Sequence, residues 1–281
     1  MPLALPAVDC HAHVFDPQRF PLADTGGHMP APAECGTPAQ FAAVLDAHGV
    51  SHGLLVNAQA GYGLDNRCML DAIARSNGRF KGVALIGHGI TDAELEALRA
   101  GGVAGARFNL LFAHATSIRG DAGIRLLSRL QEIGWFAQIY YRDDAIVDVL
   151  PALEATGIRV VIDHCGGFDP ARGLGQAGFR ALLDLGRGGR AAIKLSGAFR
   201  ISRQPWPHTD MDAYIAAILE AFGPDRCVWG SDWPFVRFPA RVDYGPQLAL
   251  LERWIPDAAA QRRVLWDNPR DWFGFAPRAD D

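Results

Sequence analysis

Two histidines stand two residues apart near the start of the chain, within Ala-Val-Asp9-Cys10-His11-Ala-His13-Val-Phe. Residues i and i+2 of a β-strand point to the same side, so Asp9, His11 and His13 are predicted to share one face. Cys10 is then predicted to lie on the opposite face, as core packing. Two imidazoles that converge at a strand end can bind a divalent metal or polarise a substrate carbonyl.

Two later apolar segments also end in titratable residues. They are Arg-Val-Val-Ile-Asp163-His164-Cys-Gly-Gly and Arg-Cys-Val-Trp-Gly-Ser-Asp232-Trp-Pro. A carboxylate such as Asp232 can take a proton from water, bind a metal or orient an imidazole. The structural alternatives are a helix or turn cap for Asp232 and a core histidine for His164. Because three separate segments end in this way, we expect one shared polar site.

These residues are carried by short apolar segments that alternate eight times with helical ones. The predicted strands are rich in Val, Ile, Leu and aromatic residues, as strands buried on both faces should be. They span residues 7–14, 52–57, 80–86, 105–110, 135–141, 159–163, 191–196 and 226–230. Eight such units predict a single (β/α)8 barrel of the TIM type over residues 1–281. A doubly wound open sheet is the alternative, but no Gly-x-Gly-x-x-Gly follows a strand to support a nucleotide site.

A closed barrel would bring the titratable residues together, because the active site of this fold lies at the C-terminal ends of the strands. The first and last strands are neighbours, so Asp232 is predicted to lie beside His11 and His13. His164 would end the sixth strand. Residues 16–36, rich in Pro and Gly, follow the first strand and are predicted to lie over the mouth, either as a lid or as a passive surface loop.

The composition excludes several classes of function. The net charge of -4 shows no basic excess, so nucleic acid and acidic membrane surfaces are not expected partners. No apolar run approaches the roughly 20 residues that span a bilayer, and the first residues lack a basic signal-peptide region. Five cysteines without Cys-x-x-Cys spacing argue against a disulfide framework or a zinc finger. We therefore expect a soluble cytoplasmic protein with a small-molecule partner; whether it forms a homo-oligomer is left open.

As a set, the segments around these residues resemble the amidohydrolase superfamily. They are Asp-Cys-His11-Ala-His13-Val-Phe-Asp-Pro, Gly-Ala-Arg107-Phe-Asn, Asp-His164-Cys-Gly, Lys194-Leu-Ser-Gly, Trp-Gly-Ser-Asp232-Trp-Pro and the closing Asp-Asn-Pro269. Within it, they are similar to the amidohydrolase-2 branch of 2-pyrone-4,6-dicarboxylate lactonases and related sugar lactonases. The resemblance runs in order along nearly the whole chain. It implies a barrel that hydrolyses a lactone C–O bond, with Asp232 as general base to water and His11, His13 and His164 around the scissile carbonyl.

Metal use divides the superfamily. Its binuclear members bridge two metals with a lysine on the fourth strand and use a further histidine on the fifth. The matching positions here resemble Arg107 and Tyr140, and a cationic guanidinium cannot bridge two metals. One zinc remains an alternative, because three imidazoles and a carboxylate can hold it with an open position. Its ligands would be His11, His13, His164 and Asp232. The resemblance favours a reaction without a metal cofactor.

Substrate binding is expected to fall to arginine, which binds carboxylates with a bidentate fork. Arg107, Arg200 and Tyr140 match family positions that contact the substrate. The alternatives are a structural salt bridge for Arg107 and a solvated loop charge for Arg200. Two expected arginines are absent, because Ala113 and Gly167 occupy their positions. This departure predicts a substrate with one carboxylate, or a hydroxylated sugar lactone. The residues that could compensate are His114, Arg142, Arg203 and Arg237.

The sequence therefore predicts a lactone hydrolase, with two rival interpretations. One is a zinc-dependent decarboxylase of the same superfamily, which also uses three histidines and an aspartate after the eighth strand. The other is a non-catalytic barrel that binds small molecules. Lys194, inside a predicted strand, is expected to form a structural ion pair rather than a Schiff base.

Overall fold

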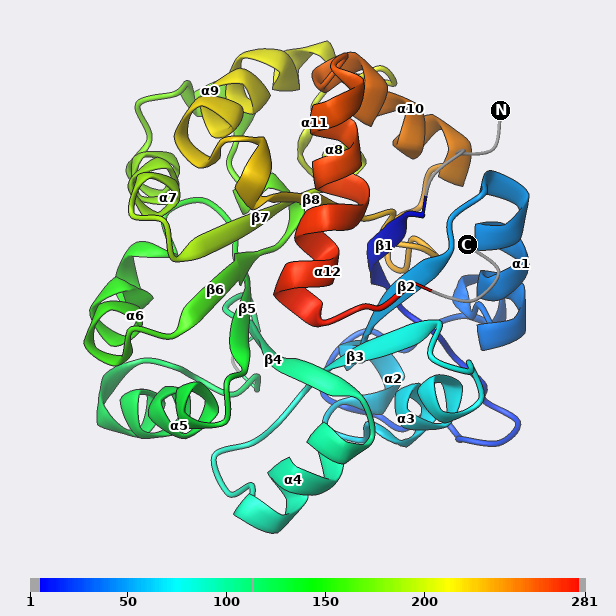
Figure 1. Cartoon of the computed structure of the whole chain (residues 1–281). Coiled ribbons are helices and arrows are strands. Elements are labelled where there is room, and N and C mark those ends of the chain that lie inside the picture. Colours follow the sequence, from blue (N-terminus) through cyan, green and yellow to red (C-terminus); the bar gives the residue numbers. More distant parts are fainter. Residues whose placement is uncertain (1–5, 113, 278–281) are drawn as a thin grey trace.

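Eight parallel strands in chain order form the centre of the computed structural model, which describes residues 6–112 and 114–277 (Figure 1). The strands are β1 Val8–Ala12, β2 His52–Val56, β3 Phe80–Ala84, β4 Val103–Asn109, β5 Phe136–Tyr140, β6 Arg159–Ile162, β7 Ala191–Leu195 and β8 Cys227–Trp229. Every predicted strand overlaps an observed one. The predicted (β/α)8 fold is therefore confirmed.

The barrel closes between β1 and the segment that follows β8. Ala12 forms a parallel bridge with Trp233. The Asp232 N–H donates to the carbonyl oxygen of His11, and the His13 N–H donates to that of Trp233, each at 2.8 Å. Because closure is made by the main chain of these residues, it places Asp232 directly beside the two histidines of the first strand.

Most of the helices surround the strands on the outside, and the last one lies across one end of the barrel (Figure 1). The helices are α1 Pro38–His48, α2 Gln59–Tyr62, α3 Arg67–Ala74, α4 Asp92–Ala100, α5 Gly120–Glu132, α6 Leu150–Thr156, α7 Ala177–Arg187, α8 Ala198–Ile201, α9 Asp212–Phe222, α10 Tyr244–Trp254, α11 Ala258–Arg262 and α12 Asn268–Phe273. Thr37 and Thr91 explain where α1 and α4 begin, because their side chains accept N–H groups of the first turn in capping boxes. In the part of the chain that the structure describes, no helix is long and apolar enough to cross a bilayer.

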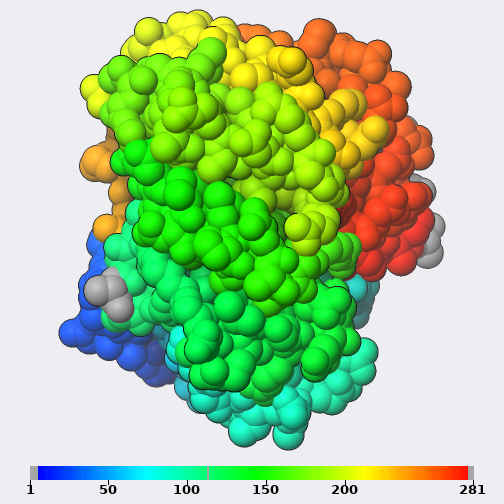
Figure 2. Space-filling model, turned by 90° about the vertical axis from the view of Figure 1, so that its left-hand side faces the viewer, coloured from blue at the N-terminus to red at the C-terminus, as the bar shows by residue number. Residues whose placement is uncertain are grey.

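Two layers of apolar side chains fill the molecule. One lies between the strands and the surrounding helices. The other fills the barrel interior, where Val8, Leu54 and Val161 meet Trp266 and Phe273 from the C-terminal segment. Helix α12 lies across this end of the barrel in Figure 1, and the side view in Figure 2 shows the red C-terminal region opposite the blue and orange segments that follow β1 and β8. The C-terminal ends of the strands therefore form the open end.

The predicted alternation along β1 is wrong at Asp9 and Cys10. The pairing of β1 with β2 shifts register between Asp9 and Ala12, so strict two-residue periodicity is broken there. Cys10 packs in the interior cluster with Val8, and the Asp9 carboxylate accepts the N–H groups of His11 at 3.0 Å and Ser231 at 2.9 Å. Asp9 therefore supports the backbone of the site instead of facing the substrate. The five cysteines are free, as expected.

Candidate active site

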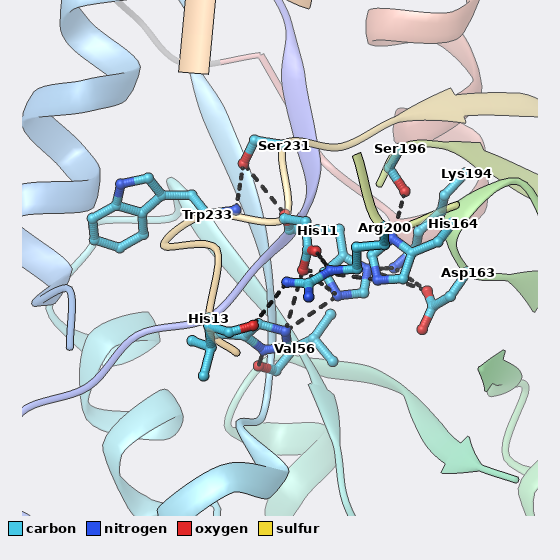
Figure 3. A network of polar contacts seen from close by, with 12 residues as sticks. His11, His13, Val56, Asp163, His164, Lys194, Ser196, Arg200, Ser231 and Trp233 are labelled. Atoms are coloured by element: carbon cyan, nitrogen blue, oxygen red, sulfur yellow. Dashed lines mark hydrogen bonds and ion pairs between the residues drawn. The ribbon is translucent and has the colours of Figure 1, made fainter. Parts of the chain in front are cut away.

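Three imidazoles and one carboxylate converge at the open end of the barrel (Figure 3). His11 lies in β1 and His13 just after it, while His164 follows β6 and Asp232 follows β8. Oδ1 of Asp232 lies 3.7 Å from Nε2 of His11 and of His13, and 3.8 Å from Nε2 of His164. All four residues are buried. The structure thus brings the four predicted catalytic residues together.

Two of these residues have an unusual backbone conformation. His164 has φ 49° and Asp232 has φ 66°, in the left-handed region that residues other than glycine rarely adopt. Hydrogen bonds support the turn at Asp232, because its N–H donates to His11 and its carbonyl oxygen accepts from Phe235 at 2.9 Å. Strained backbone of this kind concentrates at functional sites, where the surrounding structure maintains it.

The Nδ1 atom of each histidine contacts a group outside the cluster, so that its Nε2 faces the cluster. Nδ1 of His13 contacts the Val56 carbonyl oxygen at 2.8 Å, and Nδ1 of His164 contacts the Ser196 hydroxyl at 3.0 Å. A carbonyl can only accept, so the hydrogen of neutral His13 is on Nδ1 and its Nε2 is an acceptor. Nε2 of His11, 3.4 Å from Nε2 of His13, is then the donor of that pair.

A buried charge network lies behind His11. Nδ1 of His11 lies 3.2 Å from Nζ of Lys194 and 3.2 Å from Oδ1 of Asp163. Lys194 also donates to Oε1 of Gln138 at 2.8 Å and lies 3.3 Å from Asp163, while Gln138 and Arg107 both donate to Oδ2 of Asp163, at 3.0 and 2.9 Å. Lys194 is therefore an ion-paired residue, as expected. It can supply the hydrogen that the unprotonated Nδ1 of His11 accepts.

Burial and charge determine the protonation of the cluster. Burial lowers the pKa of His13 and that of His164 to about 4, and the positive charge of Arg107 adds to the effect. Burial opposes ionisation of Asp232, but the Arg200 guanidinium and the three neighbouring histidines together outweigh it and lower the pKa of that carboxyl below its ordinary value. At neutral pH the histidines are therefore neutral and Asp232 is ionised.

The three predicted substrate-binding residues all lie at the site, and two of them, Arg107 and Arg200, also form ion pairs within the protein. Arg107 pairs with Asp163 and lies over the Tyr140 ring, 5.0 Å from its centre. Nε of Arg200 donates to Oδ2 of Asp232, and its Nη2 donates to the Val236 carbonyl oxygen at 3.0 Å. Arg200 is therefore a partner of the carboxylate in this structure, not the solvated loop charge considered from sequence.

A cavity of about 270 Å³ opens above the cluster. His13, His164 and Asp232 form part of its wall, together with Arg107, Tyr140 and Arg200. Of the four residues suggested as compensating groups, His114, Arg142 and Arg237 line this cavity. Arg203 instead binds the Asp169 carboxylate at 2.8 and 3.0 Å. The long loop 16–36 contributes Thr25, Gly27 and His28 to the wall, so it does lie at the mouth.

The two departures from the family pattern have different outcomes. Gly167 has φ 56°, and a Cβ atom there would lie 2.1 Å from the Tyr141 carbonyl oxygen, so this backbone has no room for an arginine. Ala113 lies outside the described residues. Sequence reasoning gave no role to Gln138 and Ser196, which support Asp163 and His164. A polar residue inside the apolar Phe136–Tyr140 strand was the available signal for Gln138.

The donor atoms of the cluster fit one metal ion. One ligand atom each from His11, His164 and Asp232 lie within 4.8 Å of one another, and all three residues are buried. His13, the fourth predicted ligand, is not part of that set, although its Nε2 is close to His11. Support of each Nδ1 by a second group is typical of metal-binding histidines. Binding would require Nε2 of His11 to be unprotonated, with the hydrogen on Nδ1 facing Asp163.

A barrel that carries a histidine pair at the end of its first strand and an aspartate after its last defines the amidohydrolase type of site. The model of the amidohydrolase family matches residues 8–275, so the chain belongs to this family. The predicted resemblance is confirmed.

Similar proteins of known name span almost the whole chain. 4-Sulfomuconolactone hydrolase of Rhizobium radiobacter is 33% identical over 278 residues, covering 95% of this chain and 90% of that protein. The 2-pyrone-4,6-dicarboxylate hydrolase of Comamonas testosteroni is 31% identical over 277 residues, covering 94% and 88%. A solved structure of a probable 2-pyrone-4,6-dicarboxylic acid hydrolase from Acinetobacter baumannii, with citric acid bound, has a TM-score of 0.86 and 30% identity, covering 96% of this chain and 100% of that chain.

A more distant solved amidohydrolase, from Burkholderia multivorans, holds zinc. Its TM-score is 0.76 at 21% identity, covering 97% of this chain and 100% of that chain. Likeness at this level shows the shared fold alone. Proteins of this fold can therefore bind zinc, and the described residues of this chain include a group of suitable ligands.

Proposed function

We propose that the protein hydrolyses the ring ester bond of an anionic lactone. The observation that carries this proposal is the ionised carboxylate of Asp232, within 3.8 Å of three imidazole Nε2 atoms at the inner end of a cavity. Such a carboxylate can take a proton from water while neighbouring N–H groups stabilise an oxyanion. The named relatives, which act on a sulfonated and a dicarboxylated lactone, support the same substrate class.

The tautomer of each histidine determines whether its Nε2 can donate a hydrogen bond or accept one. In this structure Nε2 of His11 donates to Nε2 of His13; with substrate bound, we assign that hydrogen to the scissile carbonyl, which frees the lone pair of His13. His164 can also donate from Nε2 when its Nδ1 accepts the Ser196 hydroxyl hydrogen, so His11 and His164 polarise the carbonyl. His13 presents an acceptor, which orients the attacking water beside Asp232. This differs from the sequence-based prediction that all three histidines polarise the carbonyl. The difference arises because Val56 takes the only hydrogen of neutral His13.

Hydrolysis then proceeds through attack of water on the carbonyl and transfer of its proton, by way of Asp232, to the ring oxygen. The water oxygen bonds to the carbonyl carbon, and one water proton passes to Oδ1 of Asp232. Collapse of the tetrahedral intermediate breaks the bond to the ring oxygen, which receives that proton. The product is a ring-opened acid, and Asp232 is again ionised. An anionic group of the substrate can compete with Asp232 for Arg200, which would raise the pKa of Asp232 toward the range of an effective base.

We propose that these residues perform the reaction without a metal. Three cations, Lys194, Arg107 and Arg200, lie among or directly behind the donor groups and disfavour a further positive charge. The alternative is one zinc held by His11, His164 and Asp232. When bound, such an ion would act as a Lewis acid on the carbonyl and lower the pKa of water.

With or without a metal, we propose that loop 16–36, which contributes Thr25, Gly27 and His28 to the cavity wall, acts as a lid over the cavity.

The experiment measures hydrolysis of three lactones by chelator-treated protein and by Asp232→Asn: 2-pyrone-4,6-dicarboxylate, a 2-pyrone with one carboxylate and a sugar-acid lactone. The wild type is expected to stay active after chelation, and kcat of Asp232→Asn should fall about 10²–10⁴-fold because the general base is lost. Asp243→Asn is the matched control, since Asp243 pairs with Arg241 outside the cavity. Circular dichroism and thermal unfolding check that the variants fold.

Each rival makes a different prediction in the same assay. A binding barrel predicts binding without turnover by the wild type. A decarboxylase predicts release of carbon dioxide, whereas hydrolysis in ¹⁸O-labelled water places one labelled oxygen in the product acid. Activity that is lost on chelation and restored by zinc would overturn the metal-free reaction. Asp232→Asn with more than about a tenth of wild-type activity would overturn the role of Asp232.

A further inference from the structure

Arg237 is a cation of the cavity wall with no anionic partner among the described residues. It follows β8, is exposed, and its guanidinium lies 5.0 Å from the centre of the Phe112 ring. By contrast, Arg107 and Arg200 of the same wall pair with Asp163 and Asp232. Stacking on an aromatic face leaves the N–H edge of a guanidinium free for an anion.

The backbone of Arg237 is fixed by a hydrogen bond, although its guanidinium has no anionic partner among the described residues. Arg237 has φ 64°, and its N–H donates to Oε1 of Glu34 at 2.6 Å. Oε2 of Glu34 accepts in turn from the Ala31 N–H at 2.8 Å and lies 2.9 Å from Nε2 of His28. Segments that follow β1, β4 and β8 therefore meet at this residue, which limits the positions that its guanidinium can adopt.

The charges of the cavity favour an anion at this place. Asp232 is the one carboxylate among the described residues of the wall, and Arg200 already neutralises it. The scissile carbonyl belongs at the buried inner end, next to Asp232. An anionic substituent on the far side of the lactone ring would then face the exposed outer end, where Arg237 lies.

We propose that Arg237 binds the anionic group of the lactone farthest from the scissile carbonyl, and so selects anionic over neutral lactones. This inference rests on the proposed function for the nature of the ligand. It assigns to a segment after β8 the anion contact that the arginines missing at Ala113 and Gly167 do not supply.

The first test measures binding, which does not depend on turnover. Calorimetry gives the Kd of isophthalate, a dianion that cannot be hydrolysed, for the wild type, Arg237→Gln and Arg237→Lys. A charge-assisted hydrogen bond at a partly exposed site predicts about tenfold weaker binding by Arg237→Gln. Arg237→Lys should keep part of the affinity, because it retains the charge but not the fork.

Arg241→Gln is the matched control on the same segment. Its guanidinium is highly exposed, binds Asp243 at 2.8 Å and does not line the cavity. It removes the same charge, so a loss of affinity confined to Arg237→Gln shows a contact, whereas equal losses in both variants would overturn the proposal in favour of a general effect of net charge.

The second test separates this inference from the proposed function. With 2-pyrone-4,6-dicarboxylate, Arg237→Gln should raise KM about tenfold and leave kcat within about twofold, because the contact is remote from the reacting atoms. Wild-type turnover with an unchanged KM and Kd in Arg237→Gln would overturn the inference alone. Binding of isophthalate that depends on Arg237, without hydrolysis of any anionic lactone, would overturn the proposed function alone.

Discussion

The inner and outer ends of the cavity differ in whether their charged groups have partners within the protein. At the inner end, buried groups pair with one another: Asp163 contacts His11, Lys194, Gln138 and Arg107 within 3.3 Å. At the outer end, Arg237 has no hydrogen bond or ion pair through its guanidinium to any described residue. Groups that are already satisfied keep a fixed geometry for the reaction. Groups that lack a partner are available to the substrate, so the outer end is suited to choosing it.

The largest expected effect follows from breaking the inner network. Lys194→Met leaves Asp163 without its ammonium partner and His11 without the donor to its Nδ1. Loss of one member of a buried ion pair typically costs about 3–5 kcal/mol, so the free energy of unfolding should fall by that amount, and kcat should fall because the tautomer of His11 is no longer fixed. Denaturant titration and steady-state kinetics measure the two effects.

Lys81 provides the matched control, since it is the other lysine of the chain. It lies in β3 and is partly exposed, so Lys81→Met should change the free energy of unfolding by about 0.5 kcal/mol or less. If the two substitutions destabilise the protein equally, the inner end is not held by its charges, and the contrast with the outer end fails.

The same contrast explains how far the sequence could predict this site. His11, His164 and Asp232 were found because each stands at or just after a strand, and a barrel places all its strand ends at one opening. Lys194 was found as a charge inside a strand, and Arg107 through the family resemblance. The contact of Arg200 with Asp232 and the position of Arg237 could not be predicted, because both depend on left-handed residues in the segment after β8. The register shift in β1, which moves Cys10 into the interior, likewise has no local sequence signal.

A smaller effect concerns pH and tests the burial of the inner end. The pKa of His13 and that of His164 are about 4 in the folded protein, against an ordinary value of 6.5. The unfolded chain therefore binds more protons between these values, so the free energy of unfolding should fall as the pH drops from about 6.5 to about 4. Thermal unfolding measured across this range checks the expectation.

The pKa of Asp9 is shifted in the direction that gives the opposite dependence of stability on pH, so Asp9 provides a control. Burial raises its pKa to about 6, so its folded form binds more protons and its contribution to stability decreases as the pH rises from 3.8 to about 6. Asp9→Asn should therefore steepen the acid-side loss, whereas His13→Gln should flatten it. A stability profile that is flat between pH 4 and 6.5 in the wild type would show that the histidines are not desolvated in the way their buried positions require.

The smallest expected effect lies at the outer end, in a pair of arginines that differ in their partners. Arg142 lines the cavity and donates through Nη2 to the Arg200 carbonyl oxygen at 2.8 Å, with no carboxylate partner among the described residues. Arg203 pairs with Asp169 away from the cavity wall. Arg142→Gln should raise KM for an anionic lactone by about 3-fold to 10-fold with little change in kcat, and Arg203→Gln should leave both unchanged. Because both substitutions remove one positive charge, a difference between them measures contact with the substrate rather than the field of the protein. An equal rise in KM in both variants would mean that the outer end attracts its substrate by net charge alone, and that Arg142 does not contact an anionic group of the substrate.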